Sequence, residues 1–88
     1  MIRRRVVAHG LVQGVFFRDT VRRMADSAHV AGWVRNNWNG TLEAAFEGDE
    51  DAVERLVTFC RRGPRGAHVD CLEVVEEAPE GLRGFEIR

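Results

Sequence analysis

Hydrophobic positions change their spacing several times along the chain, and each change predicts a new element. Residues 2–9 have the character of a strand, and the glycine-bounded stretch Gly10–Gly14 separates them from a segment of helical period. The apolar residues of that segment share one helical face: Phe17, Val21, Met24, Ala25 and Ala28. We expect Gly32 to stop this helix.

A hairpin is predicted next. The short strand Trp33–Asn36 is followed by Asn39-Gly40, the dipeptide that best tolerates the positive φ angles of a two-residue hairpin turn. In the strand after the turn, apolar and polar residues then alternate: Leu42, Ala44 and Phe46 against Thr41, Glu43 and Glu47. This alternation predicts a sheet with one buried face and one wet face.

A second helix is predicted between the acidic run Asp49–Asp51 and the stop signal Arg61–Pro64. Its apolar stripe consists of Val53, Leu56, Val57 and Cys60. Acidic residues at the start and basic residues at the end both suit the helix dipole, so the bounds of this helix are well marked.

Two more strands complete the pattern. Residues 67–77 are strand-like, but their alternation slips between Val69 and Leu72, which indicates a bulge. A short strand, Phe85–Ile87, follows. The order predicts an α+β fold: a ferredoxin-like βαββαβ sandwich with two helices on one face of an antiparallel sheet and a short C-terminal strand. Because this fold hosts many unrelated functions, it does not identify one.

Chain length and net charge limit the number of domains and the kinds of partner that we expect. The 88 residues predict one domain, 1–88, and the net charge of −1 gives no overall attraction to nucleic acid or to an anionic membrane. We therefore expect no nucleic-acid or membrane partner. No apolar stretch follows the basic run Arg3–Arg5, as a signal peptide would need, so we expect a cytoplasmic location. The small size favours a monomer. Cys60 and Cys71 are too few for a disulfide scaffold or a zinc site, so we expect two small buried hydrophobic residues.

The segment that joins the first strand to the first helix is the candidate for chemistry. A loop that enters a helix presents unpaired N–H groups and the positive end of the helix dipole, which together attract anions. Arg18 falls in the first helical turn, where a positive charge is unfavourable by about 0.3–1 kcal/mol unless an anion is bound. Alternatively, Arg18 is solvated or paired with Asp19, and the glycines merely allow a tight turn.

Other phosphate sites fit less well. The chain has no glycine-lysine pair followed by Ser or Thr, as a Walker loop requires. A cysteine phosphatase would need a thiolate six residues before its arginine, and that position holds Val12. The sequence therefore shows no covalent nucleophile.

Two motifs in order resemble the paired signature of the acylphosphatase family: residues 10–18, with the sequence GLVQGVFFR, and residues 32–36, with the sequence GWVRN. The similarity extends along nearly the whole chain. Further matching segments are Phe46–Gly48, Gly63-Pro64, Val69-Asp70 and Gly84–Arg88. Leu11 and Cys71 depart from the family pattern, since basic residues are frequent at both positions.

The resemblance implies an enzyme that hydrolyses small acyl phosphates and releases inorganic phosphate, which would also inhibit it. Arg18 matches the family's phosphate-binding arginine, and Asn36 matches its water-orienting asparagine. The phosphate-binding loop corresponds to Gln13, Gly14, Val15, Phe16 and Phe17. No cofactor and no metal are implied.

Residue chemistry agrees with these implied roles. An acyl phosphate has a weakly basic carboxylate as its leaving group, so cleavage mainly needs donors around the phosphoryl oxygens and a positioned water. Arg18 can donate two parallel N–H bonds, and Asn36 offers both a donor and an acceptor. Without the resemblance, Asn36 would be interpreted as an ordinary strand-end residue.

Two other functions remain as alternatives. A ferredoxin-like RNA binder would need basic and aromatic residues on its open sheet face, and the predicted face with Thr41, Glu43 and Glu47 is unsuited to that. A noncatalytic anion-binding module would keep Arg18 but would not need Asn36. Turnover of an acyl phosphate separates such a module from an enzyme. His9 and Trp38 could border the site, and we assign neither a role.

Overall fold

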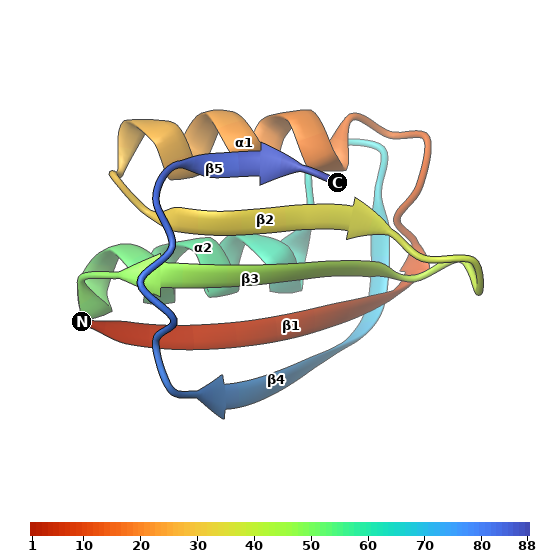
Figure 1. The fold of residues 1–88 in the computed structure, drawn as a ribbon. Helices are drawn as coiled ribbons and strands as arrows, with labels where there is room; N and C mark the ends of the chain where they lie inside the picture. The colour runs from red at the N-terminus through yellow and green to blue at the C-terminus, as the bar shows by residue number, and fades with distance from the viewer.

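The strands and helices follow one another in the predicted order (Figure 1). The computed structural model describes residues 1–88. The elements are β1 (Ile2–Leu11), α1 (Phe17–Ser27), β2 (Ala31–Asn36), β3 (Leu42–Gly48), α2 (Glu50–Arg62), β4 (His68–Glu77) and β5 (Phe85–Ile87). None of the helices has the length and apolar character needed to cross a membrane.

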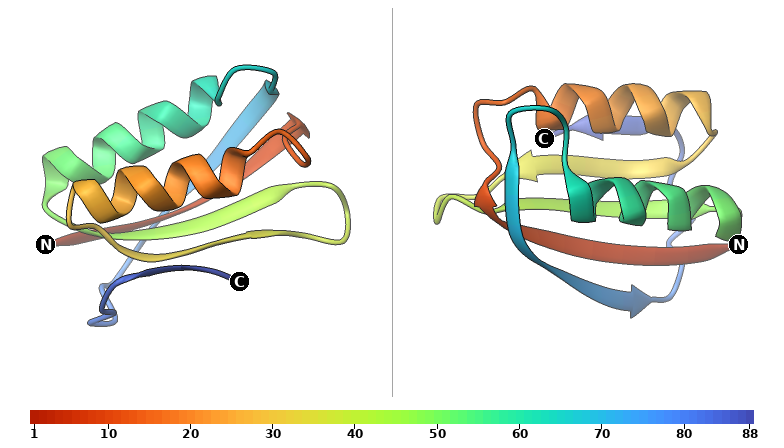
Figure 2. Two further views of the ribbon diagram at one scale, coloured as in Figure 1. Left: turned by 90° about the horizontal axis from the view of Figure 1, so that it is seen from above. Right: turned by 180° about the vertical axis from the view of Figure 1, so that it is seen from behind.

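The five strands form one sheet in the order β4-β1-β3-β2-β5. Both helices cover the same face of this sheet, which confirms the α+β, ferredoxin-like arrangement (Figure 2). The first four strands pair antiparallel, whereas β5 pairs parallel with β2. The sheet is therefore mixed, and the expectation of a wholly antiparallel sheet is wrong at β5. The connector 78–84 carries the chain from one sheet edge to the other, so that β5 runs beside β2 in the same direction (Figure 1).

A single hydrophobic cluster lies between the helices and the sheet. The face predicted for α1 supplies buried Phe17, Val21 and Ala25. Phe17 meets Phe59 of α2 edge to face, with ring centroids 5.9 Å apart. Removing such apolar surface from water is worth about 25 cal/mol per Å². This packing fixes the N-terminus of α1 relative to the ends of the strands.

The end of α1 differs from its prediction. The helix stops at Ser27, and His29 takes the left-handed conformation with φ 56°. The Val30 N–H donates to the Ala25 carbonyl at 2.9 Å and the His29 N–H to Asp26 at 3.3 Å, the bonds of a Schellman motif. Gly32 therefore does not stop the helix and lies inside β2 instead. The prediction missed this because it looked for glycine at the helix end, whereas a non-glycine residue with positive φ is uncommon, even though histidine is among those that adopt it more often.

The hairpin between β2 and β3 is confirmed, but its turn is longer than predicted. The Asn37 N–H donates to the Thr41 carbonyl at 2.8 Å, and the Gly40 N–H donates to the Asn37 carbonyl at 3.1 Å. These bonds close a three-residue loop, in which Gly40 has φ 89° and Asn39 has no positive φ. Asn39 instead accepts hydrogen bonds from the Thr41 N–H and hydroxyl, which favours the longer turn.

The predicted bulge in β4 is present. His9 of β1 lies opposite Cys71, whereas the next residue, Gly10, lies opposite Val69. Asp70 is therefore the extra residue on β4. Beyond the bulge β1 continues to Leu11, two residues past its predicted end, so the loop to α1 starts at Val12.

On the sheet face opposite the helices, the polar residues that were expected to be exposed to solvent are buried. Thr41, Glu43 and Glu47 are only 5%, 8% and 1% exposed. The Arg3 guanidinium lies 2.7 Å from the Glu47 carboxylate, and that of Arg5 lies 3.0 Å from Glu43. Long basic side chains from β1 thus cover the acidic positions of β3, an arrangement that strand alternation does not reveal.

The two cysteines lie in different environments. Cys60 on α2 is fully buried, but Cys71 is exposed. The expectation of two buried thiols is therefore wrong for Cys71. Its strand, β4, lies at the edge of the sheet, and both helices cover only one of the two sheet faces. Cys71 lies on the face that the helices leave open.

Candidate active site

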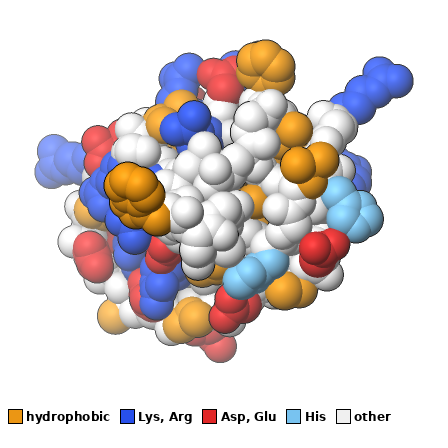
Figure 3. Space-filling view, turned by 90° about the vertical axis from the view of Figure 1, so that its right-hand side faces the viewer, with side chains coloured by type: hydrophobic (Ala, Val, Ile, Leu, Met, Phe, Trp, Pro, Cys, Tyr) orange, Lys and Arg blue, Asp and Glu red, His pale blue; other side chains and the backbone are white.

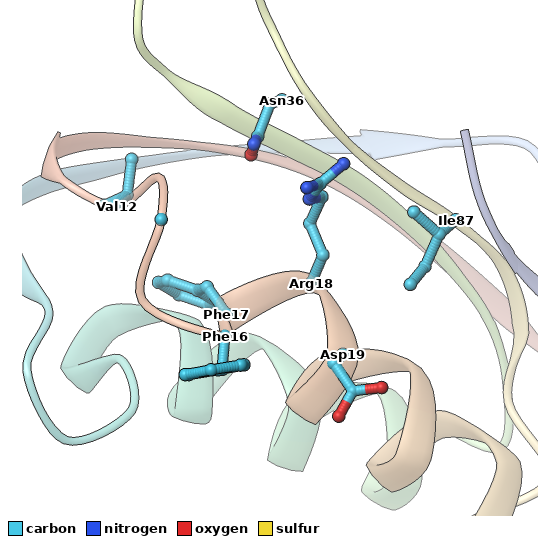
Figure 4. A pocket seen from close by; sticks show the side chains of 8 residues that line it. Val12, Phe16, Phe17, Arg18, Asp19, Asn36 and Ile87 are labelled. Atoms are coloured by element: carbon cyan, nitrogen blue, oxygen red, sulfur yellow. The ribbon is translucent and has the colours of Figure 1, made fainter.

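A pocket of about 340 Å³ lies where the loop between β1 and α1 meets the ends of β2 and β5 (Figure 4). Its walls come from three separate parts of the chain: residues 12–19, Asn36 and Ile87. The lining residues are Val12, Gly14, Phe16, Phe17, Arg18, Asp19, Asn36 and Ile87. The pocket contains both residues of the predicted catalytic pair, which are 18 positions apart in the sequence.

The loop beside this pocket carries main-chain N–H groups that no acceptor in the chain satisfies. Gly14 and Phe16 have φ angles of 74° and 59°, and Phe16 is the N-cap of α1. The N–H groups of residues 14–19 donate no hydrogen bond within the chain, and the first helical bond runs from Thr20 to the Phe16 carbonyl at 3.1 Å. Left-handed residues between right-handed ones turn successive N–H groups inward and form an anion-binding concavity. The positive end of the α1 dipole adds to this field.

Arg18 is the second residue of α1, and its side chain reaches across the pocket toward Asn36 (Figure 4). It forms no ion pair or hydrogen bond within the chain. Asp19, the partner considered from the sequence, is instead bound by Arg22 at 3.5 Å and by Arg23 at 3.1 Å. In Figure 4 the Asp19 carboxylate points away from the Arg18 guanidinium. The alternative of an Arg18–Asp19 pair is therefore wrong, and the guanidinium is free to meet an anion.

Asn36 is the last residue of β2, at the entry to the hairpin. Its Oδ1 atom is buried and has no hydrogen-bond partner, and it is the only such side-chain atom in the protein. Leaving a buried carbonyl oxygen unpaired costs about 1–3 kcal/mol. A polar group kept unpaired in a pocket, opposite a free arginine, indicates a site that binds a ligand or water there.

Gln13 and Val15, two of the five predicted loop residues, do not line the pocket. The Gln13 carboxamide donates to the carbonyls of Asn37 and Thr41, at 2.9 and 3.1 Å. Val15 packs against the hydrophobic core. The Gln13 side chain therefore fastens the loop to the hairpin, and sequence spacing alone had not indicated this bond.

Two lining residues had no sequence signal. Val12 was expected only as part of the glycine-bounded loop, and Ile87 reaches the pocket because β5 pairs beside β2. His9 and Trp38 do not line the pocket. His9 lies against Glu73 on the other face of the sheet, and Trp38 is fully exposed in the hairpin.

No cluster of three or more His, Cys, Asp or Glu side chains is arranged to hold a metal ion. The only polar side chains in the pocket walls are those of Arg18, Asp19 and Asn36. Such a pocket can bind a small anion through one guanidinium and a row of amides.

Comparisons with known proteins show which family this chain resembles. Residues 4–87 match the family described as Acylphosphatase. The chain is 53% identical over 85 residues to an acylphosphatase of Rubrobacter xylanophilus, covering 96% of this chain and 77% of that protein. It is 50% identical to one of Gloeobacter violaceus, covering 98% and 92%. The acylphosphatase of Bacillus subtilis superposes with a TM-score of 0.94 at 36% identity, covering 100% and 99% of the two chains.

Proposed function

Because the chain belongs to the acylphosphatase family of enzymes, we propose that it hydrolyses the carboxyl–phosphate anhydride of small acyl phosphates by direct attack of water. The products are a carboxylate and inorganic phosphate. In this proposal Arg18 and the loop amides hold the phosphoryl group, and Asn36 orients the water. One observation carries the assignment: a free guanidinium faces an unpaired, buried amide oxygen in one pocket.

Holding the phosphoryl group is the task of Arg18 and the loop. The planar guanidinium donates two parallel N–H bonds to two phosphoryl oxygens, and the unpaired amides of residues 14–19 are available to the third. Charge spreads over these oxygens in a loose transition state, so donors that are already in place stabilise it without rearrangement. The absence of an ion-pair partner leaves the full charge of Arg18 available for this purpose.

Activation of the water falls to Asn36. Its Oδ1 accepts a hydrogen bond from the attacking water, and the fixed position at the end of β2 aims that water at the phosphorus atom. The leaving group is a carboxylate, which departs without a proton donor, so the mechanism needs no general acid. This is consistent with the direction of Asp19, which is bound to two arginines and points away from the guanidinium.

The proposal is tested by comparing turnover of acetyl phosphate with the inhibition constant of inorganic phosphate. Arg18→Ala removes contacts made in both the ground state and the transition state, so turnover falls and phosphate binding weakens. Arg18→Lys rescues poorly because a point charge lacks the two parallel donors. Asn36→Ala lowers kcat by about 100-fold or more with little change in phosphate affinity. Arg23→Ala, an exposed arginine on the same helix, is the control and retains activity.

Other outcomes would exclude parts of this mechanism. A folded Asn36→Ala variant with full activity would remove the water-orienting role. A protein that binds phosphate but turns over no acyl phosphate would be a noncatalytic anion-binding module. We expect phosphate to inhibit competitively and EDTA to leave the rate unchanged, because the positive charge comes from Arg18 and the amides. Activity lost with EDTA and restored by a divalent ion would contradict that source of charge.

A further inference from the structure

The two residues on either side of Asn36 face away from the pocket. Side chains alternate along a strand, so a strand that points Asn36 toward the helices points its neighbours to the open face of the sheet. The register of β2 and β3 agrees with this. Asn36 lies opposite Leu42, which is buried in the core, and Arg35 lies opposite Glu43. The side chain of Asn37, the first residue of the hairpin turn, also reaches Glu43.

Glu43 binds both of these neighbours through one oxygen atom. Its Oε1 accepts a hydrogen bond from the Arg35 guanidinium and another from the Asn37 carboxamide, each 3.1 Å long. The Nε of Arg35 in turn donates to Oδ1 of Asn37, also at 3.1 Å. These three side chains close a triangle of hydrogen bonds, which we call the Glu43 triangle. Glu43 is only 8% exposed, so water cannot easily replace a bond that is lost.

The Glu43 triangle is fixed to the rest of the sheet at two points. Arg5 of β1 donates to Oε2 of Glu43, the oxygen that the triangle leaves free, at 3.0 Å. The Arg35 guanidinium lies over the Trp33 ring, 5.0 Å from its centroid. Figure 3 views the end of the molecule that carries the pocket, and basic and acidic side chains lie against one another on its left, along the open sheet face. A shift of residues 35–37 would therefore break bonds to β3 and disturb the ion pair between β3 and β1.

The position of Asn36 is one that needs such support. Its Oδ1 is buried without a hydrogen-bond partner, which costs free energy. A strand end next to a turn opens locally more easily than the middle of a strand, and a small shift there would expose this oxygen to water. An unfavourable arrangement persists only where the surrounding structure holds it in place. The bonds of Arg35 and Asn37 with Glu43 supply that support from the other face of the sheet.

We propose that Glu43 is a positioning residue, which holds Asn36 in the place from which its side chain orients the attacking water. This inference rests on the role that the proposed function gives to Asn36, and it adds the group that fixes Asn36 in space. Glu43 does not line the pocket, so it makes no contact with the phosphoryl group or the water. It acts through the two residues that flank Asn36, and its effect falls on turnover rather than on phosphate binding.

The test compares kcat for acetyl phosphate with the inhibition constant of inorganic phosphate. In Glu43→Ala, which removes the triangle, kcat should fall about 10-fold while the inhibition constant changes little. Glu43→Gln keeps an acceptor oxygen at the same place, so its kcat should lie between those of Glu43→Ala and the wild type. Glu77→Ala is the matched control, because Glu77 binds two arginines of β1 on the same sheet face but no residue of β2 or the hairpin. It should lose stability and keep the wild-type kcat.

A double-mutant cycle with Asn36→Ala separates positioning from a general structural effect. A residue that acts through Asn36 has nothing left to position once the amide is removed, so Glu43→Ala should lower kcat little further in the Asn36→Ala background. A merely structural residue would lower kcat by the same factor in both backgrounds. Equal factors would therefore overturn the positioning role, and so would a phosphate affinity that falls as much as kcat in Glu43→Ala.

Arg35→Met tests the same triangle if Glu43→Ala does not fold. Methionine keeps an unbranched side chain over the Trp33 ring but removes the two hydrogen bonds that Arg35 contributes. We expect the same pattern, a lower kcat with little change in phosphate affinity, and a folded Arg35→Met variant with the wild-type kcat would overturn the inference.

The proposed function is tested separately by Asn36→Ala. A kcat that falls in Asn36→Ala but not in the Glu43 and Arg35 variants would overturn the positioning role and leave that function intact. Full activity of Asn36→Ala would remove the water-orienting role and this inference with it.

Discussion

At the scale of single residues, the site depends on hydrogen bonds that hold its parts together. Gln13 is the clearest case, because one carboxamide nitrogen donates to two carbonyls of the hairpin, those of Asn37 and Thr41. The loop that carries the amides is thereby fixed to the segment that follows Asn36. In the proposed mechanism, such a bond would set the distance between the phosphoryl group and the water, so we expect Gln13 to affect catalysis without contact to the substrate.

Two replacements of Gln13 test this role. Gln13→Met keeps the length of the side chain but removes both donors, and we expect the free energy of unfolding to fall by about 1–2 kcal/mol and kcat to fall more than phosphate affinity. Gln13→Glu turns the donors into acceptors that face two carbonyls, so it should be worse than Met in both respects. Urea unfolding and steady-state kinetics provide the values. Equal behaviour of Gln13→Glu and the wild type would contradict the assigned hydrogen bonds.

At the scale of elements, β2 and β3 approach so closely that only glycine fits at one position. A Cβ atom on Gly32 would lie 1.8 Å from the carbonyl oxygen of Ala45 on β3, and the φ of Gly32 is 142°. The neighbour is backbone, which cannot move aside without breaking the pairing of the two strands. Since β2 ends at Asn36, any displacement of this strand also moves the site.

Gly32→Ala should therefore destabilise the protein severely, by about 4 kcal/mol or more. Gly40→Ala is the matched control: its φ is also positive, at 89°, but no atom lies within 4 Å of the added Cβ. It should cost only about 1–2 kcal/mol, from backbone strain alone. Denaturant unfolding of both variants makes the comparison. Similar losses in the two would show that strain, rather than contact with Ala45, is the main effect.

The two cysteine-bearing elements, α2 and β4, should differ in reactivity. Burial raises the pKa of the Cys60 thiol to about 12, so no thiolate forms near neutral pH, while Cys71 is exposed. A thiol reagent should label one cysteine rapidly in the native protein and two in urea. Neither side chain lines the pocket, so the labelled protein and a Cys71→Ser variant should keep turnover within a few-fold. Rapid labelling of Cys60 in native conditions would contradict the packing of α2.

At the scale of the whole molecule, a network of ion pairs covers the sheet face opposite the helices. Arg3 binds Glu47 at 2.7 Å and Glu77 at 2.8 Å, while Arg5 binds Glu77 at 2.8 Å and Glu43 at 3.0 Å. Glu47 also accepts hydrogen bonds from the N–H groups of residues 80–82. These bonds hold the connector that leads from β4 to β5 against the sheet. The network therefore joins β1, β3, β4 and the segment that brings Ile87 to the pocket.

These contacts lower the pKa of the three carboxyl groups. For Glu47, burial alone would raise the pKa, but the hydrogen bonds from the Glu80 N–H, Arg3 and two further N–H groups outweigh it. For Glu43, burial is likewise outweighed by bonds from Asn37 and two arginines. The pKa of Glu77 is lowered first by its hydrogen bond with Arg3. A carboxyl group whose pKa is lower in the folded state than in the unfolded state stabilises the fold. This stability is fully present above the pKa of the unfolded state, and it is lost as the pH falls through the pKa of the folded state.

The free energy of unfolding should therefore decrease as the pH falls below about 4.3, the ordinary glutamate pKa. Glu47→Gln should be less stable than the wild type at pH 7, because it leaves the buried Arg3 without a full counter-charge. Between neutral and acidic pH, the free energy of unfolding of Glu47→Gln should fall by less than that of the wild type. Urea unfolding at several pH values measures both effects. Parallel curves for the two proteins would mean that Glu47 does not contribute to acid sensitivity.

The sequence by itself determined the features that depend on neighbouring residues. The apolar stripes of α1 and α2 follow from helical period, and the slip between Val69 and Leu72 marks the bulge, because period is a local property of the chain. The anion-binding loop and Arg18 were predicted for the same reason, since a loop that leads into a helix carries unpaired amides wherever it occurs.

Only the tertiary structure decided the features that depend on which strands become neighbours. Ile87 reaches the pocket because β5 pairs parallel with β2, and Glu47 is buried because Arg3, 44 residues away, lies across it. Gln13 meets carbonyls 24 and 28 residues further along the chain. Side-chain alternation shows which face a residue takes but not what covers that face. The pairing of distant strands decides which side chains lie over each face of the sheet and which residues line the pocket.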